Sequence, residues 1–122
     1  MKASTSVSKA KLIANTLYQF CKEGISINSR YNKPESGYMV ATHTGPIFRS
    51  VKDINPIAVE KWIEGLLSLG SLYFGAWTDK DNGYIHFDGS ICVADKETAL
   101  HYGREALQHA IYDVENEEEI RL

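Results

Sequence analysis

The chain lacks a run of apolar residues long enough to cross a membrane. None of its hydrophobic stretches reaches the roughly 18 residues that a transmembrane helix needs. Its first residues, MKASTSVSKAK, also lack the apolar centre of a signal peptide. The sequence therefore predicts a cytoplasmic protein.

Cysteine is scarce, and positive charge is not in excess. The two cysteines, Cys21 and Cys92, lie in apolar patterns on separate predicted elements, which favours reduced core thiols over a disulfide. The net charge of −3 argues against a protein that holds duplex nucleic acid through its phosphates. A small anionic ligand in a local basic pocket remains compatible with this balance.

Sequence motifs of common enzymes are missing. The chain contains no GxxxxGK[ST], no GxGxxG, no HExxH and no CxxC. The four histidines are dispersed, and no two of them have the spacing of a metal site on one helix. We expect neither a metal nor a cofactor.

The chain has the length and the patterning of one α+β domain, residues 1–122. With 122 residues, 43% of them hydrophobic, it can bury a single core. Apolar spacing predicts three helices, and Asn55 with Pro56 and Asp95 are good first residues for the second and third. Short β-prone segments joined by turns predict a mostly antiparallel sheet. The expected helices span 8–23, 56–69 and 96–109, and the expected strands include 25–27, 37–44, a partner after Gly45-Pro46, and two segments near the C-terminus.

A hairpin is predicted around Asn82-Gly83. Apolar runs flank this pair, which is the commonest sequence of a two-residue type I′ turn. With these two residues in the turn, Trp77 faces Asp88 and Asp79 faces His86. One face of the hairpin then carries the core residues Leu72, Phe74, Ala76, Ile85 and Phe87, and the other carries Tyr73, Trp77, Asp79, Tyr84, His86 and Asp88.

The second face of the hairpin is aromatic, which is unusual for a surface. Its rings can stack on a base or pack against another subunit, and both interpretations stay open. On the predicted third helix, Glu97, His101, Arg104 and Gln108 form one polar stripe that either contacts a ligand or faces solvent. Acid/base chemistry by Asp79, Asp88 and His86 is a further alternative.

Residues 28–37 form a long loop rich in Asn, Ser, Pro and Gly. Its Arg30, Tyr31 and Lys33 make it a candidate ligand lid, with Arg30 as a candidate contact, and a mobile connection is the alternative.

The C-terminal half, FGAWTDKDNGYIHFDGSICVADKETALHYGREALQHAIYD, resembles a family of phage anti-defence proteins. That family counters the Thoeris system, and its members are sponges for cyclic ADP-ribose. The shared pattern is F-G-x-W-x-D, an acidic-Gly turn, an aromatic-rich strand ending in Asp, V-x-D, and a helix with Gly-Arg and Gln before A-I-Y-D. It covers about 40 residues well.

The resemblance implies a protein that is not an enzyme and that buries a cyclic ADP-ribose messenger intact. It also implies a homo-oligomer with ligand pockets between subunits. By motif, the hairpin would contribute Phe74, Trp77, Tyr84 and Asp88, and the helix Arg104 and Gln108. Phe74 is also expected in the core, so the two interpretations of this residue conflict. The alternatives are a phosphodiesterase acting on the same nucleotides through His86 and Asp88, and an inhibitor that binds a host protein through the aromatic face.

Overall fold

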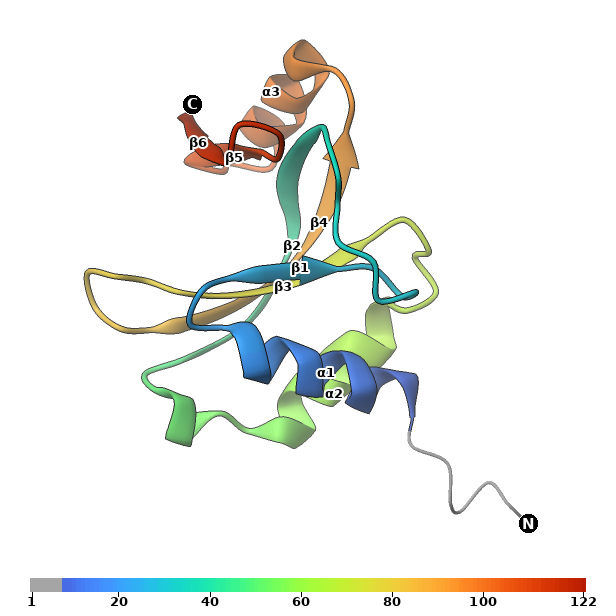
Figure 1. Cartoon of the computed structure of the whole chain (residues 1–122), viewed down its shortest axis with the longest axis vertical. Coiled ribbons are helices and arrows are strands. Elements are labelled where there is room, and N and C mark those ends of the chain that lie inside the picture. The colour runs from blue at the N-terminus through green and yellow to red at the C-terminus, as the bar shows by residue number, and fades with distance from the viewer. Residues whose placement is uncertain (1–7) are drawn as a thin grey trace.

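The computed structural model, which describes residues 8–122, has an α+β fold with a curled antiparallel sheet and three helices (Figure 1). The sheet has six strands in the order β1-β3-β4-β2-β5-β6. This confirms the predicted fold class. The helices are α1 (Lys9–Phe20), α2 (Pro56–Leu66) and α3 (Lys96–Glu105), and the strands are β1 (Ile25–Ile27), β2 (Tyr38–Phe48), β3 (Tyr73–Thr78), β4 (Ile85–Val93), β5 (Ala110–Asp113) and β6 (Glu118–Arg121).

Each helix begins at a side chain that caps its first turn. Asn55 accepts hydrogen bonds from the backbone N–H groups of Ile57 and Ala58, and Asp95 accepts one from Thr98, as the sequence predicts. Ser8 caps α1 in the same way, through the N–H of Lys11. The helices are shorter than predicted at their C-terminal ends.

The C-terminal end of α3 differs from the prediction. The helix stops at Glu105, and Leu107 adopts a left-handed conformation with φ 57°. The apolar spacing of residues 96–109 predicts that Leu107 faces inward, and this is wrong, because its side chain is 86% exposed. Gln108 lies beyond the helix, and the polar stripe that was expected to include it is therefore shorter.

Two hydrophobic cores share the long strands β2 and β4. The larger core lies between α1, α2 and the sheet, and it contains Phe74, Ala76, Ile85 and Phe87, as predicted. The smaller core lies around Val40, Ala99 and Ile111, where α3 packs on the far end of β2 (Figure 1). The two long strands therefore connect the α1/α2 layer to the α3, β5 and β6 segment.

Strand β2 runs straight through the predicted turn at Gly45-Pro46. Its register with β4 shifts between Ala41 and His43 and again between Thr44 and Ile47, so the extra residues form bulges. A side chain at residue 45 would lie 2.7 Å from the carbonyl oxygen of Phe87 and 2.8 Å from the ring of Trp62. The predicted turn between two strands is thus wrong, because residues 38–48 form one continuous bulged strand. Glycine is needed at residue 45 because the Phe87 backbone and the Trp62 ring pack closely against it.

The β3–β4 hairpin has a longer loop than predicted. Asp79 and Tyr84 form the last backbone pair, with the N–H of Asp79 2.8 Å from the carbonyl oxygen of Tyr84. The loop consists of residues 80–83, and of the two expected turn residues only Gly83, at φ 78°, has a positive φ. The type I′ turn is therefore wrong, although Gly83 still occupies the position that favours glycine.

The longer loop moves the register of the hairpin by two residues. Trp77 faces His86 rather than Asp88, and Thr78 faces Ile85 rather than Phe87. Because side chains alternate with a period of two, a shift of two residues leaves every side chain on its predicted face. The predicted separation into a core face and an aromatic face is thus correct, while the predicted partners are wrong.

Among residues 8–122, no helix is both long and apolar enough to span a membrane.

Candidate ligand-binding site

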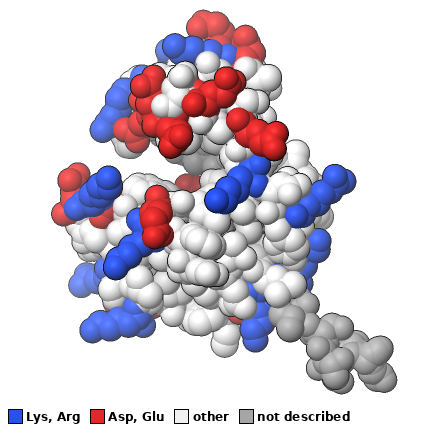
Figure 2. All heavy atoms as spheres, in the orientation of Figure 1, with Lys and Arg blue, Asp and Glu red and all other residues white. Residues whose placement is uncertain are grey.

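A groove of about 120 Å³ lies on the face of the sheet opposite the α1/α2 core. Strand β2 forms one wall, the paired strands β3 and β4 form the floor, and the segment after α3 closes one end. The lining residues are Ala41, Thr44, Ile47, Trp77, His86, Phe87, Asp88 and Gln108. Figure 2 shows the molecule hollowed between its two parts on this side of the chain.

Two stacked rings dominate the groove. The indole of Trp77 lies nearly parallel to the imidazole of His86, with ring centroids 4.3 Å apart and an interplanar angle of 11°. The pair exists because the two residues face each other across the ladder on the same side of the sheet. Trp77 remains 41% exposed, so part of this residue is accessible to a ligand.

The imidazole of His86 is covered by this stack. Its Nε2 atom is buried and has no hydrogen-bond partner among the described residues. Buried polar atoms without partners are rare in proteins and often mark a functional position. His86 therefore packs against one face of Trp77 and keeps its Nε2 atom away from solvent.

The carboxylate of Asp88 lies beside the stacked rings. Burial raises the pKa of this carboxyl group, and hydrogen bonds from the Trp77 indole N–H and the Ser90 hydroxyl, together with the nearby His86, lower the pKa in part. The Ser90 hydroxyl is 3.5 Å from Oδ1 of Asp88. The carboxylate thus lies at the groove beside the indole and offers an acceptor to a donor group of a ligand.

The structure brings three of the predicted site residues together. Trp77 and Asp88 come from the hairpin, and Gln108 reaches the same groove from the segment after α3. Phe74 does not join them, because it is 1% exposed and packs edge-on against Trp62 in the core. The conflict over this residue is thus resolved in favour of the core position.

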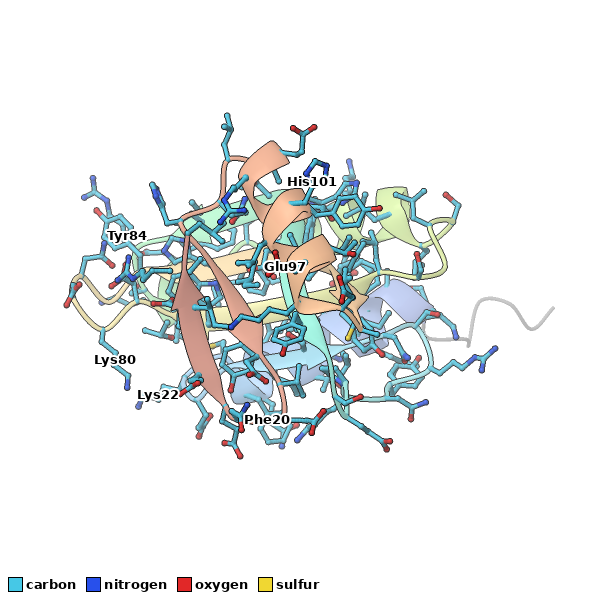
Figure 3. All side chains as sticks on the ribbon, turned by 90° about the horizontal axis from the view of Figure 1, so that it is seen from above. Phe20, Lys22, Lys80, Tyr84, Glu97 and His101 are labelled. Carbon is cyan, nitrogen blue, oxygen red and sulfur yellow. The ribbon has the colours of Figure 1, made fainter. Side chains whose placement is uncertain are left out.

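Three further predicted contacts do not line the groove in a single chain. Tyr84 lies at the outer end of the hairpin, well away from Glu97 and His101 on α3 (Figure 3). Arg104 is exposed on the last turn of α3, and Arg30 is exposed on the loop that follows β1. Neither arginine is among the residues that line the groove.

The β2 wall of the groove cannot be recognised from the sequence pattern of any single element. Thr44 and Ile47 reach it because the Gly45-Pro46 bulge keeps both residues on the Trp77 side of the sheet. The Gly-Pro pair was the available signal, but this pair is also typical of a turn. His86 was predicted on the correct face as a candidate acid or base, and its contact with Trp77 depends on the corrected register.

The charge around the groove is uneven. The segment from residue 95 to the C-terminus is acidic, and red side chains crowd this part of the surface in Figure 2. No lysine or arginine lines the groove itself. The acidic residues of this segment are Asp95, Glu97, Glu105, Asp113, Glu115, Glu117, Glu118 and Glu119, against the basic residues Lys96, Arg104 and Arg121.

Neither cysteine forms a disulfide: Cys21 is buried, and Cys92 is partly buried. In the described part of the chain, no group of three or more His, Cys, Asp and Glu side chains is arranged to hold a metal ion.

Comparisons of the chain with protein families, with curated proteins and with solved structures found no match.

Proposed function

We propose that the protein is a non-catalytic sponge, which binds a cyclic ADP-ribose messenger and withholds it from the effector of Thoeris immunity in the cytoplasm of an infected cell. The proposal combines the sequence resemblance with the chemistry of the groove. The ligand would stay intact, and no metal or cofactor would take part.

The stacked position of Trp77 is the observation that supports this proposal most directly. One face of the indole is covered by His86, Asp88 lies beside it at the groove, and Trp77 remains 41% exposed. Because this ring is already fixed in the free protein, stacking on adenine costs little additional side-chain entropy. Asp88 and Gln108, at the same groove, can accept hydrogen bonds from the adenine amino group or a ribose hydroxyl.

The groove of one chain is too small for the whole messenger. Its 120 Å³ lies below the range of about 300 to 1,000 Å³ that is typical of small-molecule pockets. The groove also lacks the positive charge that a pyrophosphate requires. We therefore propose that a second copy of the chain completes the site and supplies the phosphate contact, with Arg104 as the candidate.

Exposed apolar side chains near the groove support an assembly of this kind. Ile47, on the β2 wall, is 49% exposed, and Leu107, which precedes Gln108, is the most exposed large hydrophobic residue described. Exposed apolar side chains that gather in one patch are typical of protein–protein interfaces. Light scattering at micromolar concentration should give the mass of at least a dimer, and a monomer would contradict this part of the proposal.

Calorimetry with the messenger tests the binding. Trp77→Ala should weaken binding by about 1 to 3 kcal/mol, the usual loss for a stacked base. Arg104→Ala should weaken it at least tenfold, because a buried phosphate contact is worth about 2 to 5 kcal/mol. Phe20→Ala, which removes a similarly exposed ring from α1 on the other side of the sheet, should bind like the parent.

Heating the complex and identifying the released nucleotide tests sequestration. A sponge returns the messenger intact and in a fixed ratio to protein.

The alternative of a phosphodiesterase is favoured by one observation, the raised pKa of Asp88 beside an imidazole, a pairing that suits general acid/base chemistry. Hydrolysed nucleotide with multiple turnover would replace the sponge with that enzyme.

A further inference from the structure

An open cavity that is larger than the groove lies away from it. It measures about 760 Å³, within the range of about 300 to 1,000 Å³ that suits a small-molecule ligand. Its walls come from the loop after β1, the turn between α2 and β3, the first residue of β3 and the end of β4. The lining residues are Asn28, Asn32, Lys33, Glu35, Ser36, Gly70, Ser71, Tyr73 and Cys92.

The loop that forms the main wall is fixed by hydrogen bonds. The side chain of Asn28 accepts from the backbone N–H groups of Arg30 and Asn32, and the carbonyl oxygen of Asn32 accepts from the N–H of Asn28. Lys9 donates to the carbonyl oxygen of Ser29 at 2.9 Å, and the Cys92 thiol donates to that of Ser36 at 3.1 Å. The cavity therefore has a preformed wall.

The backbone of this wall is hydrogen-bonded, but most of its side chains are not. Among the described residues, no side-chain hydrogen bond or ion pair is made by Lys33, Glu35 or Tyr73, and the same holds for Asn32, Ser36 and Ser71. Lys33 and Glu35 flank Pro34 and both line the cavity without pairing with each other. These six lining residues therefore leave side-chain donors and acceptors without a partner inside the described chain.

The chemistry of the lining selects a neutral ligand that is rich in hydroxyl groups. One cation and one carboxylate balance each other, so neither an anion nor a cation is favoured by net charge. No aliphatic side chain lines the cavity, which excludes an apolar ligand. A sugar hydroxyl both donates and accepts, as do the amides and hydroxyls present here, and Tyr73 adds one aromatic side chain to the lining.

We infer that this cavity is a second binding site, independent of the groove, for a short neutral saccharide. The two cavities share no lining residue. Their aromatic residues, Tyr73 and Trp77, lie four positions apart on one strand face, which corresponds to about 13 Å. Saccharide binding at this site can therefore be tested independently of the sponge function.

Cys92 provides a local probe of this cavity, because it lines the wall while Cys21 is buried. Burial raises the pKa of the Cys92 thiol, so iodoacetamide labelling should be followed at about pH 9. The rate is measured by mass spectrometry of the two cysteine peptides, with N,N′-diacetylchitobiose, maltose and cellobiose as probes. At ten times its dissociation constant, a bound saccharide should slow labelling of Cys92 about tenfold.

Charged analogues and variants give the controls. Glucosamine and glucose 6-phosphate should protect Cys92 less than neutral sugars do, and Glu35→Gln, at an exposed loop position, should reduce protection without changing the melting temperature. Tyr73→Ala should abolish protection, while Trp77→Ala should leave it unchanged. Equal labelling with and without all three saccharides would overturn the inference, as would protection by the cyclic nucleotide, which would make the cavity part of the messenger site.

Discussion

Gly75 lies directly opposite Asp88 in the β3–β4 ladder, and the carboxylate of Asp88 occupies the space that a side chain at residue 75 would need. A Cβ atom there would lie 2.7 Å from Oδ1 of Asp88 and 3.3 Å from the carbonyl oxygen of Ile25. The aspartate at the groove therefore depends on a glycine from the neighbouring strand.

Gly75→Ala should consequently destabilise the protein by about 1 to 3 kcal/mol, the usual cost of overpacking. It should also weaken nucleotide binding, because Asp88 would have to move away from Trp77. Chemical denaturation and calorimetry measure the two effects. Gly65→Ala, in α2 with no atom within 4 Å of the new Cβ, is the matched control and should stabilise by about 0.5 to 1 kcal/mol. Equal stability of Gly75→Ala and the parent would contradict the placement of Asp88.

Gly83→Val should destabilise the hairpin by about 1 to 2 kcal/mol, because a β-branched residue resists the φ of 78° at this position. No atom lies within 4 Å of the new Cβ, so the effect would come from the backbone alone. Gly70→Val, at another open position without a positive φ, is the control. If both variants melt alike, the loop does not place Gly83 in the left-handed region.

The raised pKa of Asp88 predicts a pH dependence of stability. In the unfolded chain the carboxyl group titrates near its ordinary pKa of about 4, and burial raises the folded-state pKa above that value. Between the two pKa values the folded state binds more protons, so this group's contribution to stability falls as pH rises through the window. Asp88→Asn should remove that fall in stability. At pH values above this window, the variant should be more stable than the parent.

Denaturation of parent and Asp88→Asn at several pH values, compared as a difference, measures this contribution. The difference is needed because Asp95 and Asp113 act in the opposite direction. Hydrogen bonds from Thr98 and Asn116 lower their pKa values, so their contribution is lost as pH falls. A difference between the two proteins that does not change with pH would show that Asp88 titrates normally.

Tyr18→Phe should leave stability unchanged or raise it by about 1 kcal/mol. The Tyr18 hydroxyl is buried with no hydrogen-bond partner among residues 8–122, and its ring packs edge-on against Phe87. Burial and the nearby Glu60 raise the pKa of Tyr18 to about 12. Tyr112→Phe, at an exposed position, should have no effect. A marked loss of stability in Tyr18→Phe, measured by thermal melting, would reveal a partner for the hydroxyl.

His86 should affect nucleotide binding without contacting the ligand. His86→Ala should weaken binding because the indole of Trp77 loses the ring beneath it, whereas His86→Phe should retain most of the affinity by keeping a flat support. Calorimetry of both variants, together with Trp fluorescence, separates support from direct contact. If His86→Phe and His86→Ala weaken nucleotide binding equally, an imidazole nitrogen rather than the flat ring is required for binding.

The local features of this fold were predictable because each has a short sequence signature. Asn55 with Pro56 and Asp95 mark helix starts, and alternation along the hairpin separates the core face from the aromatic face. The same alternation predicted Trp77 and Asp88 on the aromatic face, and the polar stripe of the third helix marked Gln108 as a candidate ligand contact.

The hairpin register could not be predicted, because side chains in the loop decide it. Asp79 accepts from the N–H of Asp81, and Asn82 accepts from the N–H of Tyr84, and these bonds favour the four-residue loop. The β2 wall was missed for a different reason. A bulge at Gly45-Pro46 becomes distinguishable from a turn only when β4 lies beside it, and that is a contact between distant parts of the chain.

The short pairing between the C-terminal hairpin and the rest of the sheet determines which part of the molecule should unfold first. β5 pairs with β2 at only two positions, Tyr38 with Asp113 and Met39 with Tyr112, whereas β2 and β4 pair along most of their length. The segment from α3 to β6 should therefore exchange its amide hydrogens through partial unfolding, before the strands beneath α1 and α2 do. Because Gln108 belongs to that segment, occupancy of the groove would slow this opening, and binding would register as amide protection far from the ligand.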